Sequence, residues 1–217
     1  MKLSMIAVAC VAAALMLVPS FAVAAYVETF DTDNAGWNVG YGLDFQSPQL
    51  GATSVSPGGN PGGYISGSVT NTDTGHSLYA MWTNDTARFG DMNGTTLTID
   101  TMVTGGASGT AQFYVGRGGT YFVDGQWDIS SDANWTTHQA ELNTTNFVPW
   151  TGVNDGVYTL AEVLQAPTDV GIFFGGGMAT GAGTLNIDNY GTVPEPATMG
   201  LLILGGLAAL ARRRRMA

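Results

Sequence analysis

The sequence is poor in cysteine and in basic residues. Its single cysteine, Cys10, lies in an apolar N-terminal run, so the rest of the chain has no disulfide and no zinc site with thiolate ligands. Between Tyr26 and Val193 the only lysine or arginine residues are Arg88 and Arg117, against sixteen acidic residues, which gives a net charge of −14. Such a surface repels phosphate groups, so we expect neither nucleic acid nor anionic lipid as a partner of this region.

Recognisable catalytic machinery is also lacking. The chain has two histidines, His76 and His138, and no Gly-x-Ser-x-Gly motif, so no trio of nucleophile, base and orienting group stands out. Sixteen acids always supply some pair of carboxylates at the separation that a glycosidase needs, so their number is no evidence for one. We therefore predict no catalytic residues and no enzymatic activity.

Long apolar runs occur only at the two ends, and the first has the organisation of a signal peptide. Residues 1–25 begin with the positive charge of Lys2 and continue with the apolar segment Leu3–Val18. Small residues then offer a cleavage site, either Ala22-Val23-Ala24 or Val23-Ala24-Ala25. The sequence therefore predicts an exported protein.

The C-terminal end, residues 193–217, has three parts in a fixed order. A short motif comes first, then the apolar segment Ala197–Ala211, then a run of basic residues. A helix of these 15 apolar residues spans about 22 Å, less than the ~30 Å hydrocarbon core of a bilayer. The basic run favours the cytoplasmic side, so we expect a transient anchor in the inner membrane. The motif and the basic run consist of Val193, Pro194, Glu195, Pro196, Arg212, Arg213, Arg214 and Arg215.

This tail closely resembles the PEP-CTERM sorting signal of Gram-negative bacteria. The resemblance implies recognition by an exosortase, a membrane cysteine peptidase, and delivery to the cell surface or to the extracellular matrix. Exopolysaccharide, the material of a biofilm, is then an expected partner. The tail itself carries no information about a ligand.

The middle of the chain, residues 26–192, is predicted to be all-β. Glycine is abundant, with 31 in the whole chain, and short runs of β-branched and aromatic residues alternate with Gly, Asn, Asp and Pro, as in a β-sandwich with many turns. The pattern predicts strands at 26–30, 37–41, 64–70, 78–83, 95–103, 111–116, 121–123, 136–142, 170–174 and 184–190. In the clearest of these strands, Leu97, Ile99, Thr101 and Val103 should face the core.

One short helix is predicted after Thr159. Thr159 and Glu162 have the spacing of a capping box. Leu160, Val163 and Leu164 then form one apolar stripe, and Pro167 ends the helix. So short a helix needs tertiary support, and we expect it at one end of the sandwich.

Several blocks of the middle region resemble the laminin IV (laminin B) domain. They are the Gly59-Asn60-Pro61-Gly62-Gly63-Tyr64 stretch, the 87–100 block and Leu185-Asn186-Ile187-Asp188-Asn189. This resemblance implies a jelly-roll sandwich of the galactose-binding-like kind. It also implies a structural calcium ion between the first and last strands, for which Glu28, Asp31, Asp33 and Asp188 are the candidate ligands, because calcium takes oxygen ligands. The alternative is that these acids shape turns.

Four aromatic residues are candidates for sugar binding. Tyr121, Trp127, Trp135 and Trp150 lie in loop-like contexts near Asn and Asp, and sugar sites combine aromatic side chains with hydrogen-bonding groups. Large aromatic residues more often belong to the core, which is our expectation for Trp37 and Trp82.

Three functions remain open on these observations. The leading one is a non-enzymatic surface or matrix protein that binds exopolysaccharide or lies within it. The others are a secreted carbohydrate-active enzyme and a purely structural surface subunit.

Overall fold

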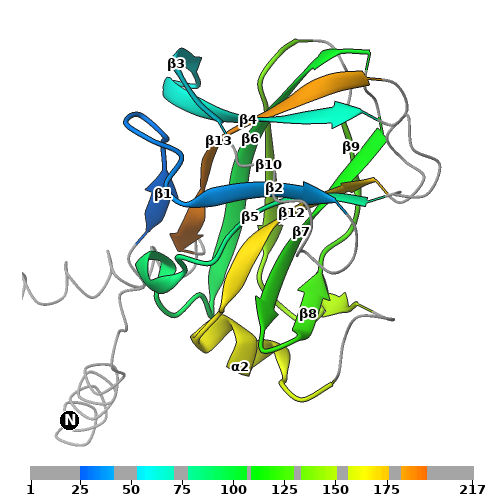
Figure 1. The fold of residues 1–217 in the computed structure, drawn as a ribbon. Coiled ribbons are helices and arrows are strands. Elements are labelled where there is room, and N and C mark those ends of the chain that lie inside the picture. Colours follow the sequence, from blue (N-terminus) through cyan, green and yellow to red (C-terminus); the bar gives the residue numbers. More distant parts are fainter. Residues whose placement is uncertain are drawn as a thin grey trace, which may run out of the picture.

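The computed structural model describes residues 25–41, 53–70, 78–106, 109–129, 133–150, 156–175 and 182–194. The expected signal peptide before Ala25 and the tail after Pro194 lie outside the described residues. Nearly all of the described chain is β-structure, arranged in two antiparallel sheets (Figure 1).

The first sheet is built around the last strand of the domain. Its order is β10-β6-β13-β4-β3, and β1 also pairs with β13, beyond the region that pairs with β4. A β-bulge between Asp188 and Gly191 separates these two parts of β13. The strands are β1 (Tyr26–Glu28), β3 (Thr53–Gly59), β4 (Gly62–Thr70), β6 (Thr95–Gly105), β10 (Thr136–Glu141) and β13 (Ala182–Pro194).

The second sheet has the order β11-β8-β7-β12-β5-β2, with β9 paired to β7. Its central strands β12 and β7 pair with each other along six residues, from Asp169 opposite Gly116 to Phe174 opposite Ala111. The strands are β2 (Trp37–Tyr41), β5 (Leu78–Thr83), β7 (Gly109–Arg117), β8 (Thr120–Val123), β9 (Trp127–Ile129), β11 (Val148–Pro149) and β12 (Asp169–Gly175).

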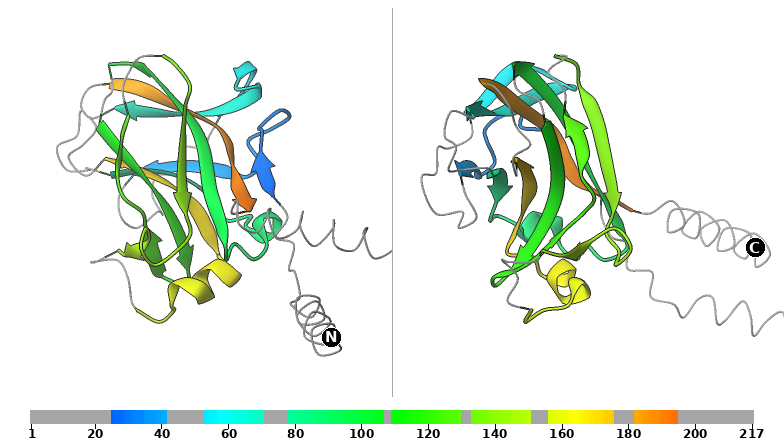
Figure 2. Two further views of the ribbon diagram at one scale, coloured as in Figure 1. Left: turned by 180° about the vertical axis from the view of Figure 1, so that it is seen from behind. Right: turned by 90° about the vertical axis from the view of Figure 1, so that its right-hand side faces the viewer.

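The two sheets pack face to face around one large core (Figure 2). Leu97, Ile99 and Val103 of β6 are buried in it, as the alternation of that strand predicts. From the opposite sheet, Phe113 and Ile172 enter the same core. The fold is a jelly-roll β-sandwich, which confirms the predicted fold class.

The second sheet carries a further aromatic cluster on its other face. Tyr114 lies between the core residues Phe113 and Val115 on β7 and therefore points away from the core. Its ring stacks on that of Phe173 with the centroids 4.2 Å apart. Trp82, expected to be a core residue, is buried in this cluster, whereas Trp37 is buried in the main core.

The predicted helix is present as α2 (Leu160–Gln165), and it lies at one end of the sandwich (Figure 1). The capping box is complete, because the Glu162 amide donates to Thr159 Oγ1 and the Thr159 amide donates to the Glu162 carboxylate. The hydrogen bonds that the Thr159 amide and hydroxyl donate to the carboxylate lower the pKa of Glu162. A single 3₁₀ turn, η1 (Ala87–Phe89), precedes β6. In the described part of the chain, no helix has the length and apolar character to cross a membrane.

The first and last strands lie side by side at one end of the sheet. Tyr26 of β1 is opposite Thr192 of β13, and on its other side β13 pairs Val193 with Thr96 and Pro194 with Thr95. The first two residues of the C-terminal motif are therefore part of the sandwich.

Candidate functional site

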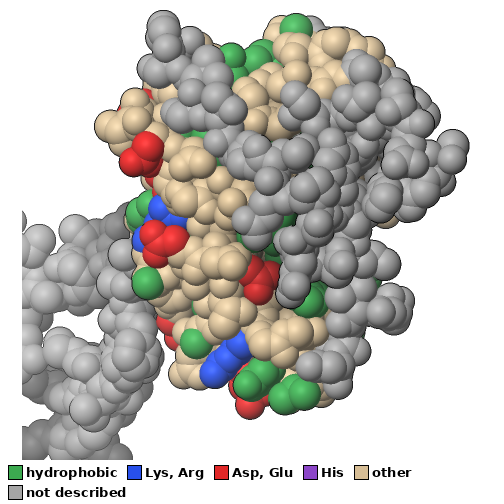
Figure 3. Space-filling model, in the orientation of Figure 1, with side chains coloured by type: hydrophobic (Ala, Val, Ile, Leu, Met, Phe, Trp, Pro, Cys, Tyr) green, Lys and Arg blue, Asp and Glu red, His purple; other side chains and the backbone are tan. Residues whose placement is uncertain are grey.

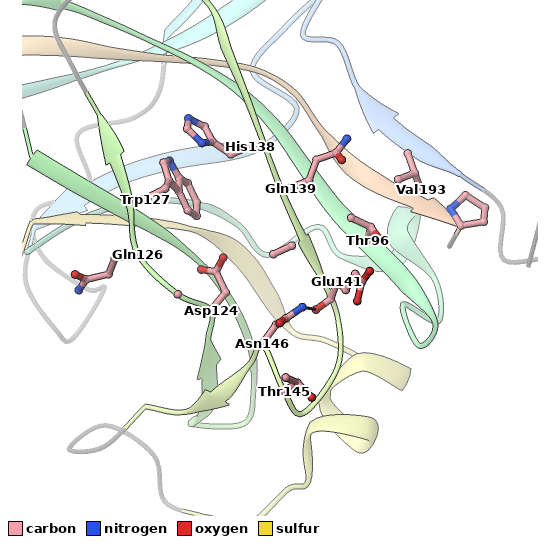
Figure 4. Close-up of a pocket in the computed structure, with 13 residues that line it drawn as sticks. Thr96, Asp124, Gln126, Trp127, His138, Gln139, Glu141, Thr145, Asn146 and Val193 are labelled. Carbon is pink, nitrogen blue, oxygen red and sulfur yellow. Dashed lines mark hydrogen bonds between the residues drawn. The ribbon is translucent and has the colours of Figure 1, made fainter. Parts of the chain in front are cut away.

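A hollow of about 850 Å³ surrounds the edge strand β10 (Figure 4). We call it the Trp127 pocket. On one side of β10 it is lined by Asp124, Gln126, Trp127 and His138, and on the other by Gln139, Thr96 and Val193. Glu141, Thr145, Asn146 and Pro194 complete most of the wall.

Trp127 is held between two rings. The His138 imidazole stacks on it with centroids 4.8 Å apart and an interplanar angle of 23°, and Phe113 packs against it at 4.7 Å. The indole N–H of Trp127 is buried and has no hydrogen-bond partner among the described residues. A buried donor without a partner costs about 1–3 kcal/mol. Because this nitrogen has almost no accessible surface, a ligand in the pocket would meet the indole ring and not its N–H group.

His138 is fixed by the neighbouring strand. A ring nitrogen, Nε2, lies 3.1 Å from Thr101 Oγ1 on β6. Burial lowers the pKa of His138, and the charge of Asp100 opposes this shift. The imidazole is therefore neutral at neutral pH and serves as a flat, uncharged wall.

Asp124 is the half-buried acid of the Trp127 pocket. Its Oδ1 accepts a hydrogen bond of 2.6 Å from the amide of Phe113. Burial nevertheless raises the pKa of Asp124 to about 7, because removal from water disfavours the charged form. Near neutral pH this side chain can donate as well as accept a proton, as groups in functional sites often do.

The outer rim of the pocket presents amides, hydroxyls and one carboxylate. Glu141 is exposed, and its Oε2 accepts a hydrogen bond from Asn143 Nδ2 at 3.1 Å. Asn146 Nδ2 donates to the main-chain oxygen of Glu141 at 3.2 Å. Gln126 and Gln139 are also exposed. No lysine or arginine is among the lining residues.

The four aromatic residues predicted to bind sugar do not form one site. Trp127 lines the pocket, whereas Trp135 packs edge-on against Tyr64 with centroids 5.6 Å apart. Tyr121 and Trp150 pack against the aromatic cluster on the other face of the second sheet, where the ring centroids of Trp150 and Phe173 are 4.4 Å apart. The sequence places all four in loop-like contexts, but Trp127 lies in strand β9. Tyr121 lies in β8, which confirms the strand predicted at 121–123.

The candidate calcium ligands separate into two groups. Glu28 pairs with Arg88 at 2.8 Å, and Asp33 closes a turn by accepting from the amide of Ala35. Asp31 and Asp188 instead meet at the turn between β3 and β4, where Asp31 accepts from the Gly63 amide at 3.0 Å.

Asp188 is central to this turn, which contains a cis Asn60–Pro61 bond. Its two oxygens accept from the amides of Asn60, at 2.6 Å, and Asn189, at 2.7 Å. Burial raises the pKa of Asp188 to about 6, with smaller contributions from the charges of Asp100 and Asp31. Within the described ranges, no three His, Cys, Asp or Glu side chains are grouped so that they could hold a metal ion. A calcium site at this turn stays a prediction.

The sorting-motif residues divide at the end of β13. Val193 and Pro194 pair with β6 and line the Trp127 pocket. Glu195, Pro196 and the four arginines 212–215 lie outside the described residues.

Several pocket residues were not singled out from the sequence. Asp124 precedes a glycine and has the appearance of an ordinary turn residue, and His138 was considered only as a catalytic base. Gln126, Glu141 and Asn146 belong to polar stretches without a motif. Only the pairing of β9 and β10 with different sheets brings these residues together.

Comparison with known proteins gives two findings of different scope. Residues 192–215 match the PEP-CTERM protein-sorting motif. No curated protein matches the chain.

Solved structures share the fold. A family 11 carbohydrate-binding module from Clostridium thermocellum, in complex with a β-1,3-1,4-mixed-linked tetrasaccharide, is 17% identical, with a TM-score of 0.51 over 80% of this chain and 97% of that one. An exo-β-agarase is 16% identical, with a TM-score of 0.52 over 80% of this chain and 26% of that one. At these identities the likeness concerns the fold alone. The chain is thus a jelly-roll β-sandwich, similar in fold to carbohydrate-binding modules, followed by a PEP-CTERM motif that indicates an exported protein sorted to the cell envelope.

Proposed function

We propose that this protein is a non-enzymatic surface or matrix protein that binds exopolysaccharide through the Trp127 pocket. An exosortase-type peptidase of a Gram-negative cell processes its tail after a transient stay in the inner membrane. The laminin IV-like origin of the sandwich is part of the proposal. The Gly59–Tyr64 sequence supports it, and in this chain the stretch forms a turn held by Asp31 and Asp188.

The lining of the Trp127 pocket carries the proposal for sugar binding. Ligand sites commonly measure 300–1,000 Å³ and combine apolar walls with a few polar groups, and this hollow of about 850 Å³ does so. The amides of Gln126, Gln139 and Asn146 can each donate and accept, as sugar hydroxyls do. The indole ring of Trp127 adds an apolar aromatic surface to the wall.

A solved structure of similar fold is consistent with sugar binding. The family 11 module was solved with a mixed-linked tetrasaccharide, which shows that a sandwich of this kind accommodates an oligosaccharide in that protein. In this chain, the argument rests on the pocket itself.

The test uses the secreted protein purified from its producing host. Affinity electrophoresis in gels that contain mixed-linked β-glucan, agarose, xylan or the host's own exopolysaccharide should show retardation by at least one of these polymers. Asn146→Ala and Gln126→Ala should weaken the retardation severalfold. Trp135→Phe, outside the pocket, should leave it unchanged. Failure of every polymer to retard the protein would leave the purely structural subunit as the better account.

The enzyme hypothesis has one observation in its favour, which is that Asp124 and Glu141 line the same hollow. A glycosidase needs one protonated and one ionised carboxyl group. Incubation of the same polymers with the protein, followed by a reducing-end assay, separates the two functions. We expect no release of reducing ends. Release that disappears in both Asp124→Asn and Glu141→Gln would establish hydrolysis instead.

A further inference from the structure

The charges that line the Trp127 pocket have one sign. Asp124 contributes a carboxyl group on one side of β10 and Glu141 a carboxylate on the other. Of the two histidines, His138 has a lowered pKa and stacks on Trp127, so it offers no positive charge near neutral pH. His76 lies outside the described residues. A ligand in this pocket therefore meets carboxyl groups and neutral polar groups.

The first arginine of the domain is already engaged elsewhere through both terminal nitrogens. Arg88 forms an ion pair of 2.8 Å with Glu28. Its Nη2 donates to the main-chain oxygen of Ala35 at 2.6 Å and to Thr83 Oγ1 at 2.9 Å. Only 16% of the side chain is exposed. The guanidinium therefore has little surface to offer to an anion from outside.

The second arginine is engaged beside α2. Arg117 Nη1 donates to the main-chain oxygen of Glu162 at 2.7 Å, and its guanidinium lies 4.6 Å from the centre of the Tyr158 ring. It belongs to β7 beside α2 and does not line the pocket. Because Arg88 and Arg117 are the only Lys or Arg residues from 26 to 193, the sandwich has no further lysine or arginine to place near a ligand.

The domain as a whole is also anionic, with a net charge of −14 between Tyr26 and Val193. On the face drawn in Figure 3, basic side chains occupy small spots, and the other charged side chains are acidic. An anionic polymer that approaches this domain thus meets repulsion over the surface and finds no arginine or lysine within the pocket. A carboxylate or sulfate moved into the pocket would lose its hydration without gaining a charged partner.

We propose that the Trp127 pocket selects glycans by charge: it accepts uncharged sugars and sugars with a free amine, and it rejects glycans that carry carboxylate, sulfate or phosphate groups. This proposal rests on the proposed function, since it specifies the class of sugar that the same pocket binds. Amine-bearing sugars gain from the proximity of Asp124 and Glu141. Uncharged sugars rely on the amides and hydroxyls of the rim.

The experiment compares each test polymer in three charge forms. Mixed-linked β-glucan, agarose and xylan are used unmodified, with part of their hydroxyl groups oxidised to carboxylates, and with part replaced by amines. Affinity of the secreted protein for each form is measured by affinity electrophoresis at about 20 mM and about 150 mM salt. For every polymer that binds, the amine form should bind about two- to tenfold more tightly than the unmodified form at low salt. The carboxylate form should not bind.

A matched pair of variants tests whether the pocket itself is responsible. Glu141→Lys should reverse the order, so that the carboxylate form binds and the amine form loses its advantage. Asp85→Lys makes the same change of charge at a side chain that is 67% exposed and outside the pocket. It should keep the original order.

The outcomes separate this proposal from the one on which it rests. Tighter binding of the carboxylate form than of the unmodified form would overturn the charge selection and leave polysaccharide binding intact. If Glu141→Lys and Asp85→Lys change the relative affinities for the carboxylate and amine forms equally, the net charge of the domain and not the pocket causes the selection. That result also overturns the proposal. No binding of any form of any polymer would instead refute the proposed function.

Discussion

Asp124 is tied to the main chain of Phe113 by two hydrogen bonds, one to its carboxyl group and one from its own amide. The Phe113 amide donates to Asp124 Oδ1 at 2.6 Å, and the Asp124 amide donates to the Phe113 oxygen at 3.2 Å. Phe113 is fully buried in the core, so these bonds hold an ionisable group at the junction of the core and the Trp127 pocket.

This arrangement gives the stability of the fold a characteristic pH dependence. Burial raises the pKa of Asp124 to about 7 and those of Asp169 and Asp188 to about 6, from 3.8 in each case. Between pH 4 and 7 the folded protein therefore holds protons that the unfolded chain has released. The free energy of unfolding should fall as the pH rises through this window, by an amount on the order of a few kcal/mol. His138, with its lowered pKa, opposes the trend only partly.

Urea unfolding at intervals from pH 4 to 8 measures this dependence. Asp124→Asn should remove the part of the fall that lies between pH 6 and 7, because an amide does not titrate. A free energy of unfolding that rises steadily from pH 4 to 7 would contradict the prediction.

Calcium gives a second prediction, at the turn that Asp31 and Asp188 share. If calcium binds there, thermal unfolding of the secreted protein should shift upward by several degrees in millimolar calcium and return with chelator, since a ligand of the folded state stabilises it. Asp188→Asn should abolish the shift. Glu28→Gln should preserve it, because Glu28 pairs with Arg88 away from this turn. If calcium leaves the midpoint of thermal unfolding of the wild-type protein unchanged, the predicted calcium site does not exist.

Gly63 should tolerate no side chain. An added Cβ would lie 2.1 Å from the main-chain oxygen of Phe30, and the Gly63 amide already donates to Asp31. We expect Gly63→Ala to lower the free energy of unfolding by about 1–3 kcal/mol, because backbone must shift to make room. Gly125→Ala is the matched control, since nothing lies within 4 Å of its added Cβ. Equal stability of the two variants in urea would count against the close approach of Gly63 to Phe30.

The C-terminal cut should lie beyond Pro194. Residues up to Pro194 form the end of β13, which pairs with β6 over Val193 and Pro194 and with β1 at Thr192. A peptidase that binds an extended substrate cannot reach these bonds without separating β13 from its neighbours. Intact-mass measurement of the secreted form should therefore show a C-terminus at or after Pro194. A mature chain that ends before Val193 would show that the strand opens during processing.

The sequence was most informative where a local pattern decides the structure. The alternation of Leu97, Ile99 and Val103 predicted β6 and its buried face, and the Thr159–Glu162 spacing predicted α2 with its cap. All ten predicted strands are present, with ends that differ by up to four residues. In each case the signal lies within a few residues of the chain.

Features that depend on contacts between distant segments could not be predicted in this way. The strands β3, β9 and β11 were missed, because β9 and β11 have only three and two residues and β3 ends in Pro-Gly-Gly, which is typical of a turn. The pKa of Asp124 is raised because the side chain is removed from water beside Phe113, and no local sequence pattern predicts this contact. The grouping of Trp127 with His138 likewise depends on which strands flank the edge of the sandwich.

The adjacency of β1 and β13 fixes how the domain responds to load. Because Tyr26 lies opposite Thr192 on antiparallel strands, both ends of the domain leave from one place. Tension applied between them would meet the three β1–β13 residue pairs one after another, as a zipper opens, and not all together. The sandwich is therefore suited to attachment at one end of the chain, where no force acts across the domain. It is poorly suited to bear force applied to both of its termini.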